Sequence, residues 1–170
     1  DYDHIGCFSG SAVEADGKHV LLYTGVSQKD GKEIQNQCIA IGDGKTYEKW
    51  QDNPVIKGDI MPEKFDRKDF RDPKVFRYEP EDKWVMIVSA DKEMRFYDSK
   101  NLKDWNYMSS FGEGYGVQPC QFECPDMVEL PVDGDLNRKK WALIVNVNPG
   151  CYFGGSATQY FTGDFDGKKF

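Results

Sequence analysis

The chain has 170 residues, of which 39% are hydrophobic and 14% aromatic, a composition that can supply a buried core. Its formal net charge of −7 argues against nucleic acid as a partner, because nucleic-acid binders gather Lys and Arg on one face. No apolar run reaches the roughly 18 residues of a membrane-spanning helix, and the first residues do not resemble a signal peptide. We expect a folded globular protein with a neutral or weakly polar ligand and no membrane contact, and the compartment stays open between cytoplasm and exterior.

The cysteines and histidines predict neither a disulfide framework nor a metal site. Five cysteines stand at irregular spacing, and only two of them, Cys120 and Cys124, lie close together in the sequence. A zinc site would need further ligands, but the chain has only two histidines and no second close cysteine pair. We therefore expect no metal and no cofactor.

A short phrase occurs three times, at residues 8–13, 70–75 and 122–127, as FSGSAV, FRDPKV and FECPDM. Each copy pairs a Phe with an apolar residue five places on. An apolar, β-prone run follows each copy, at residues 20–23, 84–88 and 141–145, and predicts a buried strand. The leading Phe residues are 62 and 52 positions apart, which indicates a repeat protein.

The rest of each repeat completes a four-stranded unit. A further strand candidate comes next in each copy, at residues 37–41, 94–97 and 158–161, and a turn with another segment closes it at 43–47, 98–102 and 166–170. No stretch has the 3.6-residue apolar period of a long helix. The sequence predicts an all-β protein of about three four-stranded antiparallel β-propeller blades, at approximately 1–57, 58–116 and 117–170. A β-sandwich is the alternative.

Three blades cannot close a ring, so the chain is expected to be a fragment of a larger propeller or to assemble with another chain. Its open blade faces would then mediate self-association.

Two of the three repeated phrases carry charged residues suited to sugar chemistry. Hydrolysis of a glycosidic bond needs two carboxyl groups on either side of that bond. Because the inner strands of successive blades point to one central depression, Asp72 and Glu123 can converge there, with Arg71 beside a carboxylate. The alternatives are a turn held by an ion pair for Arg71 and Asp72, and a solvated surface carboxylate for Glu123.

These motifs closely resemble the signature blocks of family 32 glycoside hydrolases, the invertases, levanases and inulinases. The resemblance rests on residues 8–13, on Arg71-Asp72-Pro73 and on Glu123-Cys124-Pro125-Asp126, and it continues through residues 148–167. It implies a five-bladed propeller that releases terminal β-D-fructofuranosyl units from sucrose or fructans with retention. It also implies that Glu123 is the general acid/base, that Asp72 and Arg71 stabilise the transition state, and that Phe8 and Ser9 line the fructose subsite.

One departure from the family pattern concerns the nucleophile. The family's nucleophile is an Asp within an Asn-Asp-Pro motif, and this chain has none; Asp52-Asn53-Pro54 has the wrong order. A retaining mechanism cannot proceed without its nucleophile. The chain alone is therefore predicted to be inactive. Two alternatives stay open: an inverting arabinan- or xylan-cleaving propeller, and a non-catalytic sugar-binding module.

Overall fold

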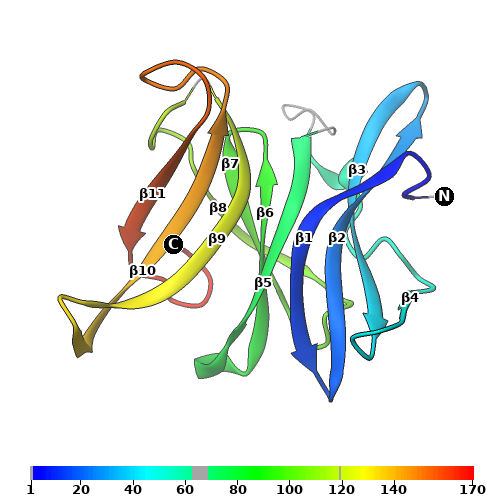
Figure 1. Ribbon diagram of the computed structural model, residues 1–170, viewed down its shortest axis with the longest axis horizontal. Helices are drawn as coiled ribbons and strands as arrows, with labels where there is room; N and C mark the ends of the chain where they lie inside the picture. The colour runs from blue at the N-terminus through cyan, green and yellow to red at the C-terminus, as the bar shows by residue number, and fades with distance from the viewer. Residues whose placement is uncertain (1, 63–68, 119) are drawn as a thin grey trace.

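The computed structural model describes residues 2–62, 69–118 and 120–170. The protein is all-β, with three antiparallel sheets arranged like an open fan (Figure 1). The first sheet consists of β1 (Gly6–Ala15), β2 (Lys18–Lys29), β3 (Lys32–Gly42) and β4 (Tyr47–Lys49). The second consists of β5 (Phe70–Tyr78), β6 (Lys83–Ala90), β7 (Glu93–Ser99) and β8 (Asn106–Phe111). The third consists of β9 (Gln121–Val132), β10 (Asp135–Asn148) and β11 (Ala157–Gly163).

Within each sheet, each strand pairs with the next one in the sequence, as in propeller blades. Asp-Gly pairs form the tight turns of three hairpins, with both residues at positive φ: Asp16-Gly17, Asp30-Gly31 and Asp133-Gly134. Such turns match the twist of the strands that they join. Two short 3₁₀ helices, η1 (Gly58–Ile60) and η3 (Glu79–Glu81), complete the described elements. Among the described residues, no helix is long and apolar enough to cross a membrane.

The predicted second and third strands of each sheet are present, but the fourth strands differ from the closing segments: β4 begins at Tyr47, β8 begins at Asn106, and the third sheet has no fourth strand. The three apolar runs lie in β2, β6 and β10, which are the second strands of their sheets. Residues 166–170, where a turn with a closing segment is expected, form a turn but no strand. The Asp166 side chain accepts hydrogen bonds from the backbone amides of Lys168 and Lys169, at 2.8 and 2.6 Å, and these bonds curl the chain.

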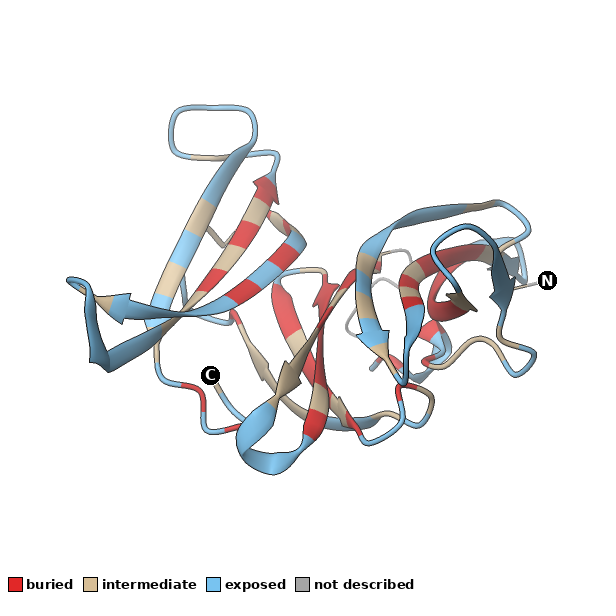
Figure 2. Cartoon of the chain, turned by 60° about the horizontal axis from the view of Figure 1, so that its bottom comes forward, coloured by how far each residue is buried: buried red, intermediate tan, exposed pale blue. Residues whose placement is uncertain are grey.

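The two hydrophobic cores lie between neighbouring sheets (Figure 2). The middle sheet is buried on both faces: along β6, Met86 and Val88 pack toward the first sheet, whereas Val85 and Ile87 pack toward the third. This alternation follows from the two-residue period of a strand. The outward face of the third sheet remains exposed.

The first strand of each sheet faces the middle of the fan. β5 lies between β1 and β9 and contacts both (Figure 1). The Ser11 hydroxyl on β1 donates to the Pro73 carbonyl at 2.8 Å and accepts from the Val75 amide at 3.0 Å. Lys74 forms an ion pair with Asp126 of β9 at 2.9 Å. Side chains thus join the three inner strands, which carry the repeated phrases.

Candidate functional site

All three repeated phrases contain a β-bulge, which falls at the same place in the second and third phrases and one residue earlier in the first. The pairing register slips between Phe8 and Gly10, between Arg71 and Lys74, and in β9 opposite the stretch between Ile144 and Asn146. A bulge adds a residue to one strand and redirects its side chains. The repeated phrase therefore marks a bulged first strand in each sheet.

Asp72 and Cys124 occupy equivalent bulge positions in β5 and β9. Both have positive φ, 62° and 47°, which costs a residue with a side chain roughly 1 to 3 kcal/mol unless its surroundings hold it there. A hydrogen bond joins the two bulges: the Cys124 amide donates to Oδ2 of Asp72 at 2.8 Å. The Asp72 side chain is therefore fixed between two inner strands, and the residue is 7% exposed.

Arg71 and Glu123 also occupy equivalent positions, one residue before their bulges, and they meet in an ion pair. Nη2 of Arg71 lies 2.7 Å from Oε1 of Glu123. Nη1 of Arg71 lies 3.1 Å from Oδ1 of Asp69, and Gln121 donates to the same oxygen at 2.7 Å. Residues at matching positions of neighbouring sheets thus bind one another twice, 69 with 121 and 71 with 123.

The ion-pair cluster keeps Arg71 charged. Burial disfavours the guanidinium charge, but the hydrogen bonds to Glu123 and Asp69 outweigh burial and raise the pKa of Arg71 above its ordinary value. The side chains of Arg71, Asp69 and Glu123 are 14%, 17% and 24% exposed, so the cluster is partly open to solvent. It can therefore meet a ligand that carries hydroxyl groups.

The thiol beside Asp72 is held in its protonated form. Burial, followed by the charges of Asp72 and Glu123, raises the pKa of Cys124 to about 11. At neutral pH this thiol is a neutral group beside the carboxylates and is a poor nucleophile.

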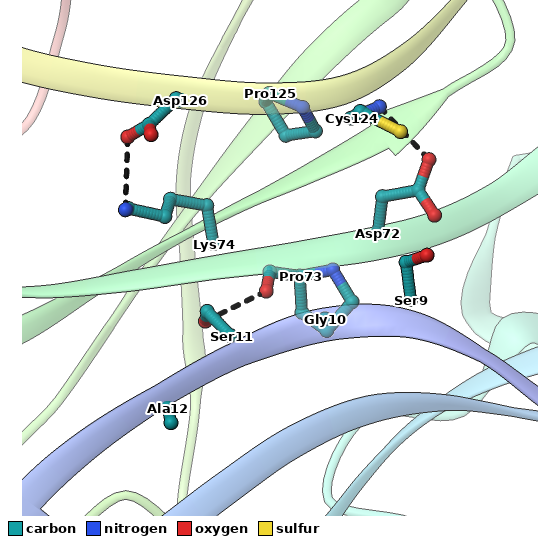
Figure 3. A pocket seen from close by; sticks show the side chains of 10 residues that line it. All are labelled: Ser9, Gly10, Ser11, Ala12, Asp72, Pro73, Lys74, Cys124, Pro125 and Asp126. Carbon is teal, nitrogen blue, oxygen red and sulfur yellow. Dashed lines mark hydrogen bonds and ion pairs between the residues drawn. The ribbon is translucent and has the colours of Figure 1, made fainter.

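A pocket of about 380 Å³ lies where the three inner strands meet (Figure 3). Ser9 of β1 and Asp72 of β5 line it from facing strands, and Lys74 and Asp126 line its other end. Gly10 also lines it, and only glycine fits there, because a Cβ at this position would lie 1.8 Å from the carbonyl oxygen of Leu22.

Phe8 lies in the first sheet, and the Asp52-Asn53-Pro54 stretch follows that sheet in the sequence. Phe8 is 46% exposed and stands directly opposite Thr24 in the β1–β2 ladder. Asp52-Asn53-Pro54 follows β4, the outer strand of its sheet. There the Asn53 side chain accepts from the Ile39 amide at 2.9 Å and donates to its carbonyl at 2.8 Å, so this stretch has a structural role.

Among the described residues, no group of three or more His, Cys, Asp or Glu side chains is arranged to hold a metal ion.

Known proteins are similar to this chain in sequence and in fold. All 170 residues match the model of the glycosyl hydrolases family 32 N-terminal domain. The levanase of Bacillus subtilis is 45% identical over 174 aligned positions. The chain belongs to glycoside hydrolase family 32.

Solved structures of the family have the same fold. The exo-inulinase of Aspergillus awamori superposes with a TM-score of 0.83 at 36% identity and covers 96% of the chain. A β-fructofuranosidase of Schwanniomyces occidentalis, complexed with fructosyl-erythritol, superposes with a TM-score of 0.78 at 34% identity over 97% of the chain. The three sheets are thus blades of a family 32 β-propeller.

The chain corresponds to only part of these relatives. It spans 24% of the levanase, 36% of the exo-inulinase and 33% of the β-fructofuranosidase.

Sequence reasoning did not find Asp69 and Gln121, which support the Arg71–Glu123 pair. Each stands one residue before the leading Phe of its phrase, and hence two residues before Arg71 or Glu123. Residues two apart on a strand share a face, so this spacing was the available signal. Thr24, whose hydroxyl accepts a hydrogen bond from the Asp72 amide at 3.0 Å, carries no such signal because it lies in the second strand of another sheet.

Proposed function

We propose that this chain is the central part of an enzyme that releases terminal β-D-fructofuranosyl units from sucrose, levan or inulin with retention of configuration. The observation that carries the proposal is the convergence of Arg71, Asp72 and Glu123 from two neighbouring inner strands. The related levanase, exo-inulinase and β-fructofuranosidase support the fructosyl substrate class. We assign approximately residues 1–57, 58–116 and 117–170 to three consecutive blades of five.

The proposed reaction divides the work among these residues. Glu123 gives its proton to the departing oxygen while the bond from that oxygen to the anomeric carbon breaks. A carboxylate outside this chain attacks the same carbon and forms a fructosyl ester. Glu123 then takes a proton from water, which attacks the ester, releases fructose and frees the nucleophile.

The other site residues bind the sugar in this scheme. Asp72 and Arg71 hold fructose hydroxyls as positive charge develops on the ring, and Phe8 and Ser9 line the subsite. The Arg71–Glu123 ion pair fixes the acid/base residue before the substrate arrives. Because the nucleophile lies outside the chain, the chain by itself is inactive.

The stereochemistry of the product tests this proposal. The protein to use is the chain together with the flanking segments of its own gene, here termed the extended protein. The proton NMR spectrum recorded in the first seconds of sucrose hydrolysis should show β-fructofuranose, and Glu123→Gln should abolish the release of fructose. Initial release of the opposite anomer would favour the inverting alternative. Sugar binding without hydrolysis would favour a binding module.

We also propose that the isolated chain associates with itself. The outward face of the third sheet exposes Val128, Leu130 and Tyr160, with exposures of 40%, 47% and 71%. Apolar side chains gathered on one sheet face favour contact with another surface.

A further inference from the structure

Two polar side chains of the first sheet are completely buried beside the candidate site. Thr24 of β2 and Gln37 of β3 are both 0% exposed. They stand directly opposite each other in the β2–β3 ladder, and Phe8 is the next residue in the same row. Buried polar groups need hydrogen-bond partners, so the partners of this pair indicate what it does.

The partners are the peptide groups on either side of Arg71. Nε2 of Gln37 donates to the carbonyl oxygen of Phe70 at 2.8 Å. The amide of Asp72 donates to the hydroxyl of Thr24 at 3.0 Å. The Thr24 hydroxyl in turn donates to Oε1 of Gln37 at 3.1 Å, which closes the arrangement. Four groups from two sheets thus form one hydrogen-bonded chain.

This chain of bonds supplies what a neighbouring strand would supply. A strand edge presents N–H and C=O groups that a partner strand normally satisfies. Here a hydroxyl accepts the N–H and a side-chain amide donates to the C=O. The backbone of β5 is therefore fixed at the bulge, where Asp72 has positive φ.

The pair also sets the direction of the site side chains. With the backbone held from the first sheet, Arg71 reaches Glu123 and Asp72 reaches the Cys124 amide, both on the third sheet. A displacement of the bulge would move both contacts together. The relative placement of the Arg71, Asp72 and Glu123 side chains thus depends on Thr24 and Gln37. In the hydrogen bonds described above, these two residues bind the backbone of β5 and none of the three side chains.

We propose that Thr24 and Gln37 are positioning residues that hold Arg71 and Asp72 in register with Glu123. The inference rests on the proposed function, since it concerns the same reaction. The chemistry of each residue is specific: a hydroxyl can accept and donate at once, and an amide offers one oxygen and one nitrogen in fixed order. Serine can replace Thr24 in this role, whereas valine, which has the same shape, cannot.

The test compares three variants of the extended protein with the wild type: Thr24→Val, Thr24→Ser and Val26→Ala. Val26 lies two residues further along β2, is 1% exposed, and serves as the buried control. Thr24→Val should lower kcat/KM for sucrose by about 30- to 100-fold through kcat, as a misplaced catalytic group does. Thr24→Ser and Val26→Ala should stay within about 3-fold of wild type, with thermal melting recorded for all four proteins.

The backbone link itself is measured in the 170-residue chain by NMR. The Asp72 amide should exchange with solvent markedly faster in Thr24→Val than in wild type, Thr24→Ser or Val26→Ala.

Three results would overturn the inference. The first is a Thr24→Val enzyme of near wild-type kcat. The second is a loss of activity that follows melting temperature equally in Thr24→Val and Val26→Ala. The third is an Asp72 amide whose exchange does not respond to Thr24→Val. A wild-type extended protein that releases no fructose would instead refute the proposed function, and the positioning claim with it.

Discussion

Arg71 and Glu123 hold the same position in two consecutive inner strands, and their side chains meet at 2.7 Å. The pairing repeats two residues earlier, where Gln121 donates to Asp69 at 2.7 Å. Repetition of one strand geometry therefore places chemically different residues face to face. A propeller can build a site in this way, because each blade presents the same position to the centre.

The two ion pairs of Arg71 predict that lysine cannot replace it. Arg71 contacts Glu123 through one terminal nitrogen and Asp69 through the other, whereas lysine offers a single ammonium group. Loss of one charged hydrogen bond, about 1.5 to 3 kcal/mol, predicts that Arg71→Lys lowers kcat/KM of the extended protein by about 10- to 100-fold. Arg138→Lys, in an exposed ion pair with Asp133, is the control and should leave kcat/KM unchanged. Equal rates for the two variants would contradict this role of Arg71.

The raised pKa of Cys124 predicts slow alkylation at neutral pH. The reactive form is the thiolate, and a pKa of about 11 leaves very little of it at pH 7.5, so the rate should be low there, increase steadily with pH and level off only near pH 11. In the unfolded chain the rate should level off near pH 8.5. Asp72→Asn removes a nearby negative charge and should shift the profile of the folded chain to lower pH. Iodoacetamide labelling of the Cys124 peptide, followed by mass spectrometry, measures the profile; fast labelling at pH 7.5 would contradict it.

Gly10 predicts a sharp difference between two glycines of one strand. A Cβ at Gly10 would lie 1.8 Å from the Leu22 carbonyl oxygen, whereas a Cβ at Gly6 would meet nothing within 4 Å. Gly10→Ala should therefore lower the free energy of unfolding by about 1 to 3 kcal/mol or more, and Gly6→Ala should change it little. Urea denaturation of both variants tests this. Similar midpoints would show that β1 relaxes at the bulge without cost.

The exposed face of the third sheet predicts association of the isolated chain. Light scattering as a function of concentration should show species larger than a monomer, and Tyr160→Lys should shift the population toward the monomer. Ile60→Lys, at an exposed apolar residue of η1, should not. A chain that stays monomeric at all concentrations would refute this proposal.

The fold was largely predictable from the sequence, because short apolar runs and turn residues mark the strands of this protein. The apolar run along β6 and the Asp-Gly turns depend on neighbouring residues alone. The third sheet lacks a fourth strand at residues 166–170 for a local reason too: the Asp166 side chain accepts hydrogen bonds from two backbone amides that a neighbouring strand would otherwise bind.

The site was predictable only where residues repeat. Arg71, Asp72 and Glu123 stood out because they vary within a recurring phrase, and the structure brings Arg71 to Glu123. Asp72 bonds to the Cys124 backbone and Glu123 pairs with Arg71, so the convergence of the two carboxyl groups on one glycosidic bond stays a prediction. Thr24 and Gln37 could not be found, because they are 48 and 33 positions from the groups that they bind. Thr24 and Gln37 bind the backbone of β5 only because the first sheet packs against the second, and a strand sequence alone does not reveal that packing.

In the proposed function, the inner strands of this chain hold the acid/base half of a fructoside-cleaving site, and the nucleophile lies outside the chain. The most direct test measures fructose release from sucrose and inulin by two samples, the 170-residue chain and the extended protein. The account predicts release by the extended protein only, and loss of that release in its Glu123→Gln variant. Hydrolysis by the 170-residue chain alone, or an extended protein that binds fructose without cleaving either substrate, would contradict it.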